Sequence, residues 1–130
     1  MADARDPGLD PGSADAVLLL GPLYHLDRRA DRRKVLAAAA RAARPGGPVF
    51  AAVISRWAAR LDGVLRNRLY QASPLAEALL TGSERTARLT PLSPGEFTGC
   101  THRPGQLRAE ITASGLRLTD LVSVEARRSC

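Results

Sequence analysis

The sequence predicts an α/β fold built around a parallel β-sheet, because an apolar strand, a helix and a second apolar strand follow one another between residues 14 and 54. Val17–Leu20 is an unbroken apolar run, which is typical of a strand covered on both faces. A proline and two glycines at positions 45–47 end the helix, and the second strand is expected over residues 48–54. A strand, crossover helix and strand in this order form a right-handed parallel unit.

The length of 130 residues and the hydrophobic content of 45% fit a single domain over residues 1–130. No apolar stretch approaches the roughly 20 residues of a membrane span, and the N-terminus lacks the apolar core of a secretory signal. We therefore expect a cytoplasmic protein with no membrane partner. Cys100 and Cys130 show no metal-ligand spacing, so both are expected to be free thiols, and no metal site is predicted.

The formal net charge of +6 raises the question of nucleic-acid binding. The arginines are spread along the chain, however, and aromatic residues make up only 4%, too few for a row of stacking rings. An arginine-rich nucleic-acid binder is therefore a minor alternative, and nucleic acid is an unlikely partner.

The helix between the two strands is expected over residues 28–43, with Asp27 as its N-cap. Helical spacing places five apolar residues on its inner face: Val35, Leu36, Ala39, Ala40 and Ala43. Four arginines fall largely off that face and are interpreted as a solvated outer surface: Arg29, Arg32, Arg33 and Arg41.

Residues 55–101 are expected to form a helical lid or acceptor region beside the strands. Within it, residues 55–80 show two helical stripes separated near Pro74, and residues 81–101 show no clear periodicity. Residues 102–125 are expected to form a helix that begins near Pro104 and a last strand over Leu116–Val124, whose apolar positions alternate.

Three segments resemble the class I S-adenosylmethionine-dependent methyltransferases that act on small molecules. These are Asp15–Leu26, Ala42–Gly47, and His102–Pro104 followed by Ala113–Leu116. The resemblance implies the fourth strand and its loop, the turn into the fifth strand, and the helix leading to the sixth. It thus implies a partial Rossmann-like methyltransferase sheet of about three strands with flanking helices. The N-terminal glycine-rich half would be absent, and this chain would be the C-terminal part of the domain.

The same resemblance implies S-adenosyl-L-methionine as cofactor and a small molecule as methyl acceptor. The acid-containing segment Asp3–Ala4 would contact the cofactor, with the carboxylate accepting a hydrogen bond from the adenine amino group. Leu20 and Gly21 end the first strand, where ligands of parallel sheets bind, and are also assigned to the cofactor. The alternative for Gly21 is a simple turn.

Tyr24 and His25 lie in the loop after the first strand and are the predicted catalytic residues, because imidazole accepts a proton near neutral pH. Arg56, Trp57 and His102 are assigned to the acceptor substrate. The alternatives are a packing role for His25, a core position for the Trp57 ring, and helix capping by His102.

A central strand at residues 17–20 needs a neighbour on each edge, yet only two other strands are predicted. We therefore expect a truncated and possibly inactive fragment that is marginally stable or associates with itself or with a complementary polypeptide. The corresponding alternative function is a non-catalytic interaction module that pairs through its exposed sheet edge.

Overall fold

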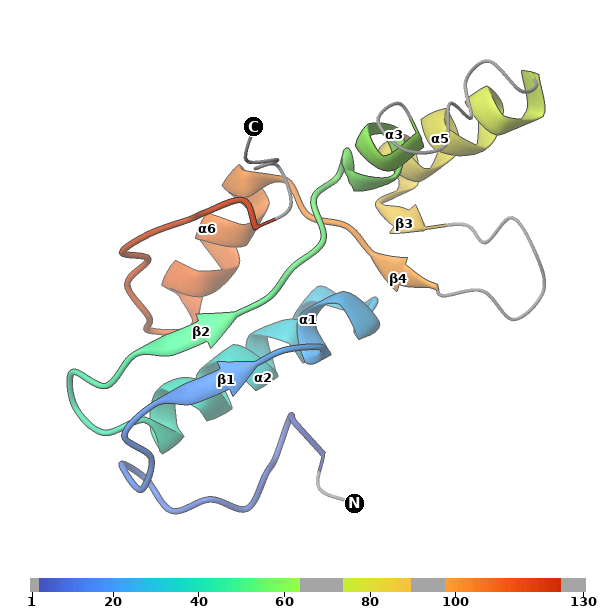
Figure 1. Ribbon diagram of the computed structural model, residues 1–130. Coiled ribbons are helices and arrows are strands. Elements are labelled where there is room, and N and C mark those ends of the chain that lie inside the picture. The colour runs from blue at the N-terminus through green and yellow to red at the C-terminus, as the bar shows by residue number, and fades with distance from the viewer. Residues whose placement is uncertain (1–2, 64–73, 90–97, 125–130) are drawn as a thin grey trace.

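The computed structural model describes residues 3–63, 74–89 and 98–124. The predicted strand, helix and strand are present: β1 (Val17–Leu19), α2 (Arg29–Ala42) and β2 (Val49–Ala51) follow one another in the chain. β1 and β2 are parallel, with Leu18 opposite Phe50 (Figure 1). The α/β class and the parallel pair are therefore confirmed, although both strands are shorter than their apolar runs.

The turn between α2 and β2 is held against the start of β1. The Ala14 and Ala43 backbones form a parallel bridge, and the Gly47 N–H donates to the Arg44 carbonyl at 2.8 Å. A Cβ on Gly47 would lie 2.9 Å from the Asp15 carbonyl oxygen. This contact explains why the turn needs a residue without a side chain at position 47.

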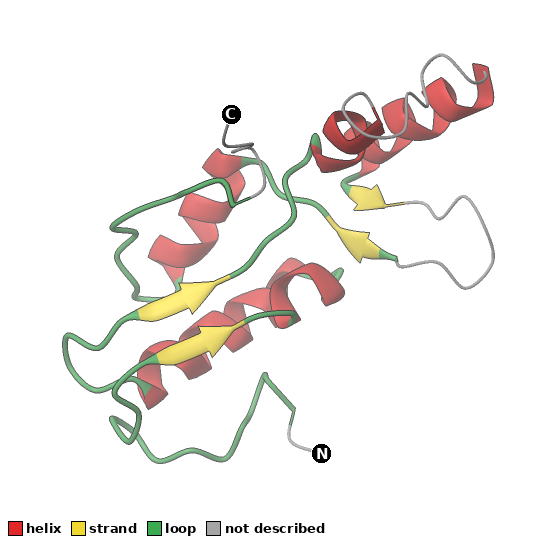
Figure 2. Ribbon diagram, viewed as in Figure 1, coloured by secondary structure: helices red, strands yellow, loops and turns green. Residues whose placement is uncertain are grey.

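The main core lies on one face of this two-stranded sheet. The short helix α1 (Pro22–His25) follows β1, and α6 (Pro104–Ala113) packs beside α2 (Figure 2). The buried residues that form the core cluster come from β1 and these three helices: Leu19, Leu23, Val35, Leu36, Ala39, Leu107 and Ile111. Burial of these side chains is the main source of stability for this half of the molecule.

The opposite face of the sheet is bare among the described residues. Leu18, Leu20 and Phe50 are 63%, 66% and 56% exposed, and β2 is the only described strand that pairs with β1. A strand with the composition of β1 is normally covered on both faces. The sequence of β1 is suited to a central strand with a neighbouring strand on each edge. Among the described residues β1 has a neighbouring strand on one edge, in agreement with the expectation.

A second small unit contains α3 (Ala58–Asp62), α5 (Pro74–Thr86), and the antiparallel pair β3 (Arg88–Leu89) and β4 (Gly99–Cys100). The expectation of irregular structure over residues 81–101 is wrong where this segment is described. α5 continues to Thr86, and Arg88 pairs with Cys100. A two-residue ladder has no periodicity that a sequence could display.

The predicted last strand over Leu116–Val124 is also wrong. The described residues after α6 form no strand. Val122 and Val124 are 71% and 86% exposed, whereas Leu116 and Leu118 pack against the core cluster. The alternation was real, but a strand also needs a neighbouring backbone, and none of the described segments supplies one.

Three details of α2 differ from expectation. Its N-cap is Arg28, not Asp27, because the Asp27 carboxylate instead forms an ion pair with Arg88 at 2.8 Å. Arg32, expected on the solvated face, points inward to Glu110. Ala40 is only half-buried, while Ala38 and Ala42 are buried.

Across the described ranges, no helix is long and apolar enough to cross a membrane.

Candidate functional site

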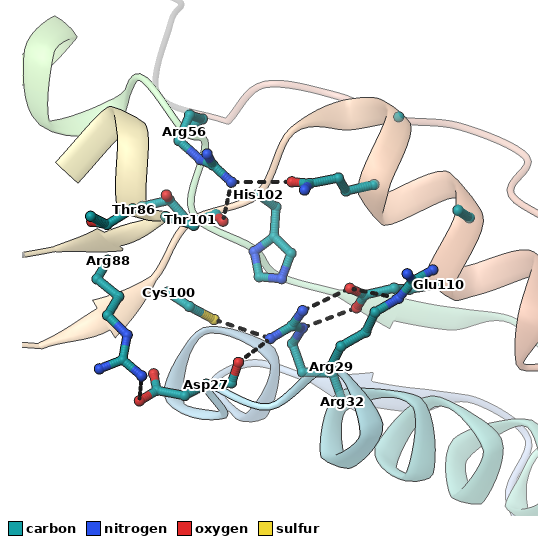
Figure 3. Close-up of a pocket in the computed structure, with 14 residues that line it drawn as sticks. Asp27, Arg29, Arg32, Arg56, Thr86, Arg88, Cys100, Thr101, His102 and Glu110 are labelled. Carbon is teal, nitrogen blue, oxygen red and sulfur yellow. Dashed lines mark hydrogen bonds and ion pairs between the residues drawn. The ribbon is translucent and has the colours of Figure 1, made fainter. Parts of the chain in front are cut away.

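A polar pocket of about 380 Å³ lies where the α1–α2 junction, β4 and the beginning of α6 meet (Figure 3). Its polar lining includes Asp27, Arg32, Arg56, Thr101, His102 and Glu110. A volume of this size accommodates a small organic ligand.

The backbone beyond β2 brings Arg56 and His102 to the same pocket. Ser55 and His102 form a parallel bridge, in which the His102 N–H donates to the Ile54 carbonyl at 2.8 Å. The Arg56 N–H in turn donates to the His102 carbonyl at 2.9 Å. Two residues separated by 46 positions are thus fixed side by side by main-chain hydrogen bonds.

Arg56 is a buried cation held by neutral groups. Its side chain donates to the Glu84 carbonyl at 2.9 Å and to the Gln106 Oε1 atom at 3.1 Å, with a longer contact of 3.5 Å to the Thr101 carbonyl. Arg56 is 6% exposed and its Nε atom has no hydrogen-bond partner among the described residues. Burial, together with the neighbouring Arg103, lowers the pKa of Arg56.

The His102 ring points into the pocket (Figure 3) and is 5% exposed. Burial lowers its pKa, and the positive charges of Arg32 and Arg56 act in the same direction, while Glu110 opposes them. The neutral imidazole is therefore favoured near pH 7. Within the described ranges, neither His102 Nδ1 nor Thr101 Oγ1 has a hydrogen-bond partner.

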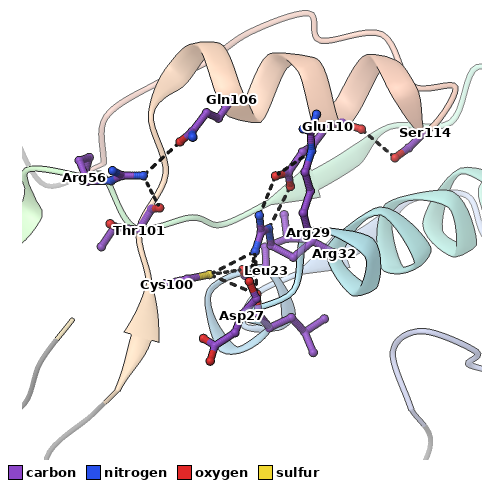
Figure 4. A network of polar contacts seen from close by, with 11 residues as sticks. Leu23, Asp27, Arg29, Arg32, Arg56, Cys100, Thr101, Gln106, Glu110 and Ser114 are labelled. Atoms are coloured by element: carbon purple, nitrogen blue, oxygen red, sulfur yellow. Dashed lines mark hydrogen bonds and ion pairs between the residues drawn. The ribbon is translucent and has the colours of Figure 1, made fainter. Parts of the chain in front are cut away.

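An ion pair beside the pocket joins α2 to α6 (Figure 4). Arg32 donates from Nε to Glu110 Oε2 at 3.0 Å and from Nη2 to Oε1 at 2.7 Å. Its Nη1 atom donates to the Leu26 and Asp27 carbonyls at 2.9 Å. Arg32 therefore ties the end of the α1 loop to α6, and its charge is neutralised by Glu110.

Cys100 lies at the inner end of β4 and is a free thiol, as expected. Its sulfur is 3.2 Å from the Leu23 carbonyl and 3.3 Å from the Leu26 carbonyl. Burial raises the pKa of this thiol, so Cys100 is protonated and serves as a hydrogen-bond donor to the α1 loop. Cys130 lies outside the described residues.

The predicted cofactor and catalytic residues near β1 form a separate group. Gly21 is buried at the carboxyl end of β1, with φ 157° and ψ −52°, and Leu20 is exposed. The Tyr24 and His25 rings are 4.9 Å apart. A Cβ on Gly21 would lie 3.9 Å from the side chains of both Tyr24 and His25, which is ordinary van der Waals contact.

Asp3 and Ala4 lie in the loop that precedes β1. Arg5 donates to both carboxylate oxygens of Asp3 at 2.6–3.0 Å, and this contact lowers the pKa of Asp3 to about 2. Ala4 is half-buried and packs against the core cluster. The Asp3 carboxylate is ionised at neutral pH and already bound by a cation.

The structure thus brings Arg56 and His102 together in the pocket, while Tyr24, His25 and Trp57 do not line it. Trp57 is 44% exposed, so its ring is not in the core. The sequence analysis missed Arg32, Glu110, Thr101, Cys100 and Gln106. The sequence pattern could have identified one of them. Glu110 lies at helical spacing from the inward-facing Leu107 and beside Ile111, which places it on the inner face of the helix.

Comparison with known proteins adds one finding. Residues 1–51 match the family model of a methyltransferase domain. The matched segment contains β1, α1, α2 and β2, together with the predicted cofactor and catalytic residues, and it ends before Arg56. Because the match lies at the N-terminal end of this chain, it does not support the assignment of the chain to the C-terminal part of such a domain. No curated protein and no solved structure matches the chain.

Proposed function

We propose that this chain takes part in S-adenosylmethionine-dependent methyl transfer to a small-molecule acceptor, as part of a methyltransferase sheet. The observation that carries the proposal is the methyltransferase match over residues 1–51. Within residues 3–63, 74–89 and 98–124, the bare face of β1 and its pairing with β2 alone support a partial sheet. We expect weak activity or none from the chain by itself.

The residues near the carboxyl end of β1 fit one wall of a methyl-donor site. Gly21 and the exposed Leu20 lie at this end of the strand, where ligands of parallel sheets bind. Asp3 would accept a hydrogen bond from the adenine amino group once Arg5 releases its carboxylate, and Ala4 would border the same ring. One wall alone gives low affinity, because most of the ligand surface stays in water.

The donor, when bound, supplies a methyl group that is already activated by a positive sulfur, so the protein mainly has to align the reacting groups. His25 is exposed on α1 next to Tyr24 and would take the proton that the acceptor releases. Arg56 and His102 would hold the acceptor in the pocket, and Trp57 would extend the contact from the start of α3.

Backbone NMR tests this proposal. Titration with S-adenosylmethionine is expected to shift the amide resonances of Asp3, Ala4, Leu20, Gly21 and His25, with a dissociation constant in the millimolar range. Asp3→Ala is expected to weaken the shifts, and Asp10→Ala, at an exposed aspartate in the same loop, is expected to leave them unchanged. Equal small shifts along the whole chain, or none, would contradict the proposal.

A second candidate function follows from the open edge of β1. Leu18, Leu20 and Phe50 form an exposed apolar face beside an unpaired strand edge, within the part of the chain that the structure describes. Such edges recruit another strand. We propose that a second copy of this chain pairs there in the purified protein, in the position that a complementary polypeptide would otherwise take.

Sedimentation equilibrium tests this second function. A concentration-dependent dimer is expected, and Leu18→Glu is expected to abolish it. The control is Leu9→Glu, which adds the same charge at an exposed leucine in the loop before β1 and should leave the dimer intact. A protein that stays monomeric at every concentration would rule out this function.

A further inference from the structure

Arg56 is unusual among the described arginines because it is buried without a carboxylate partner. Its three contacts go to two main-chain carbonyls and one amide oxygen, all of them neutral. Arg32, the other arginine deep in this region, has Glu110. Burial of an uncompensated charge is costly, so such a cation is expected to face an anion.

Three buried polar atoms beside the pocket lack a hydrogen-bond partner among the described residues. They are Arg56 Nε, Thr101 Oγ1 and His102 Nδ1, and all three belong to residues that line the pocket. Each residue is more than nine-tenths buried. Buried polar groups are almost always satisfied in folded proteins, and all three groups are able to donate a hydrogen bond.

The acids of the pocket do not compete for this position. Asp27 is bound by Arg88 at 2.8 Å, and Glu110 is bound by Arg32 at 2.7 Å. The first turn of α6 also borders the pocket, through Gly105 and Gln106, and it contains no acidic residue. A helix N-terminus carries partial positive charge, which adds to that of Arg56.

We propose that the pocket binds the anionic group of a small molecule, a carboxylate or a phosphate, through Arg56, Thr101 and His102. This inference rests on the proposed function in one respect, because it identifies the anionic molecule with the methyl acceptor. The anion binds by the same contacts whether or not a methyl donor is present. The remaining volume of the pocket takes the rest of the ligand.

The test uses the Arg56 Nε–H resonance, which NMR detects directly. Sodium phosphate and sodium benzoate serve as separate probes, and sodium chloride at equal ionic strength serves as the reference. We expect the Arg56 Nε–H signal to shift and to saturate with one of the two anions. The anion that saturates at the lower concentration identifies the chemical class of the ligand.

The Nε–H of Arg60 provides an internal control, because that group is already bound to Glu84. Thr101→Val, which removes one donor and keeps the side-chain shape, is expected to weaken binding about 3- to 10-fold. Arg56→Lys removes the reporter group, so binding in that variant is followed at the backbone amide of His102, where saturation is expected to be lost, whereas Arg60→Lys should retain saturation at Arg56. The titration of the Arg56 Nε–H signal is performed on the native protein, so the proposal can be tested even if a variant does not fold.

A linear, unsaturated shift with both anions, equal to that with chloride, would show only non-specific salt effects and would overturn the proposal. Absence of any shift would do the same. Failure of this proposal is distinguishable from failure of the proposed function, because the anion is detected at Arg56 and the methyl donor is detected at Gly21.

Discussion

Arg32 and Glu110 are 78 residues apart in the sequence and form a two-point ion pair between α2 and α6. Glu110 is 4% exposed, and its carboxylate receives a second, longer contact of 3.8 Å from Arg29. The pair lies between the core cluster and the pocket, so the same contact that joins two helices also fixes one wall of the pocket.

Removal of the negative charge by Glu110→Gln is expected to destabilise the fold by about 3 kcal/mol, because Arg32, whose side chain is only 11% exposed, would lose its counter-charge. Urea unfolding measures this loss. The matched control is Glu77→Gln, which breaks a more exposed ion pair with Arg60 and should cost less than about 1 kcal/mol. Equal losses in the two variants would contradict the importance assigned to the buried pair.

Two adjacent leucines in β1 are expected to respond very differently to truncation. Leu19 is buried in the core cluster, and Leu19→Ala should lower the free energy of unfolding by about 2–5 kcal/mol. Leu18 is exposed, and Leu18→Ala should change it by less than about 0.5 kcal/mol in the monomer. A large loss in the Leu18 variant at low protein concentration would show that its face is covered.

His102 is expected to make the fold sensitive to mild acid. Its pKa is lowered from 6.5 by burial, so below that pH the unfolded chain binds a proton that the folded chain does not. Stability is therefore full above pH 6.5 and falls as the pH drops toward the pKa of the folded state. In chloride buffers, His102→Gln should flatten this part of the pH profile of urea unfolding.

Two glycines are expected to respond to alanine with opposite signs. Gly82 lies inside α5 with open space around it, so Gly82→Ala should stabilise the protein by about 0.5–1 kcal/mol. Gly47→Ala would place a methyl group 2.9 Å from the Asp15 carbonyl and should destabilise it by about 1–3 kcal/mol. Thermal unfolding of both variants measures the difference.

The parallel unit was predictable because its signals are local. The apolar run at residues 17–20, the inner face of α2 and the proline-glycine turn each specify their own conformation. The strand expected over Leu116–Val124 failed for the opposite reason, since its alternation specifies a face but not a partner backbone. The pair β3–β4 was missed because a ladder of two residues on each strand is too short to show a periodic pattern.

Part of the pocket was predictable in the same sense. Arg56 and His102 were singled out by their place after a strand and before a helix, and the structure puts them together. The inward direction of Arg32 was not predictable from its own helix, because only the buried Glu110 explains it. Thr101 has no distinguishing pattern and is recognised only by its unpartnered hydroxyl.

The hydrogen bonds that pair β2 with β1 continue along the same chain to Arg56. The Ala52 N–H donates to the Leu19 carbonyl, and two residues later the Ile54 carbonyl accepts from His102. A slip of one position between the strands would exchange Arg56 for Ser55 or Trp57, and the pocket would lose the charge of Arg56. The alignment of two short strands therefore selects which kind of molecule this cavity is able to attract.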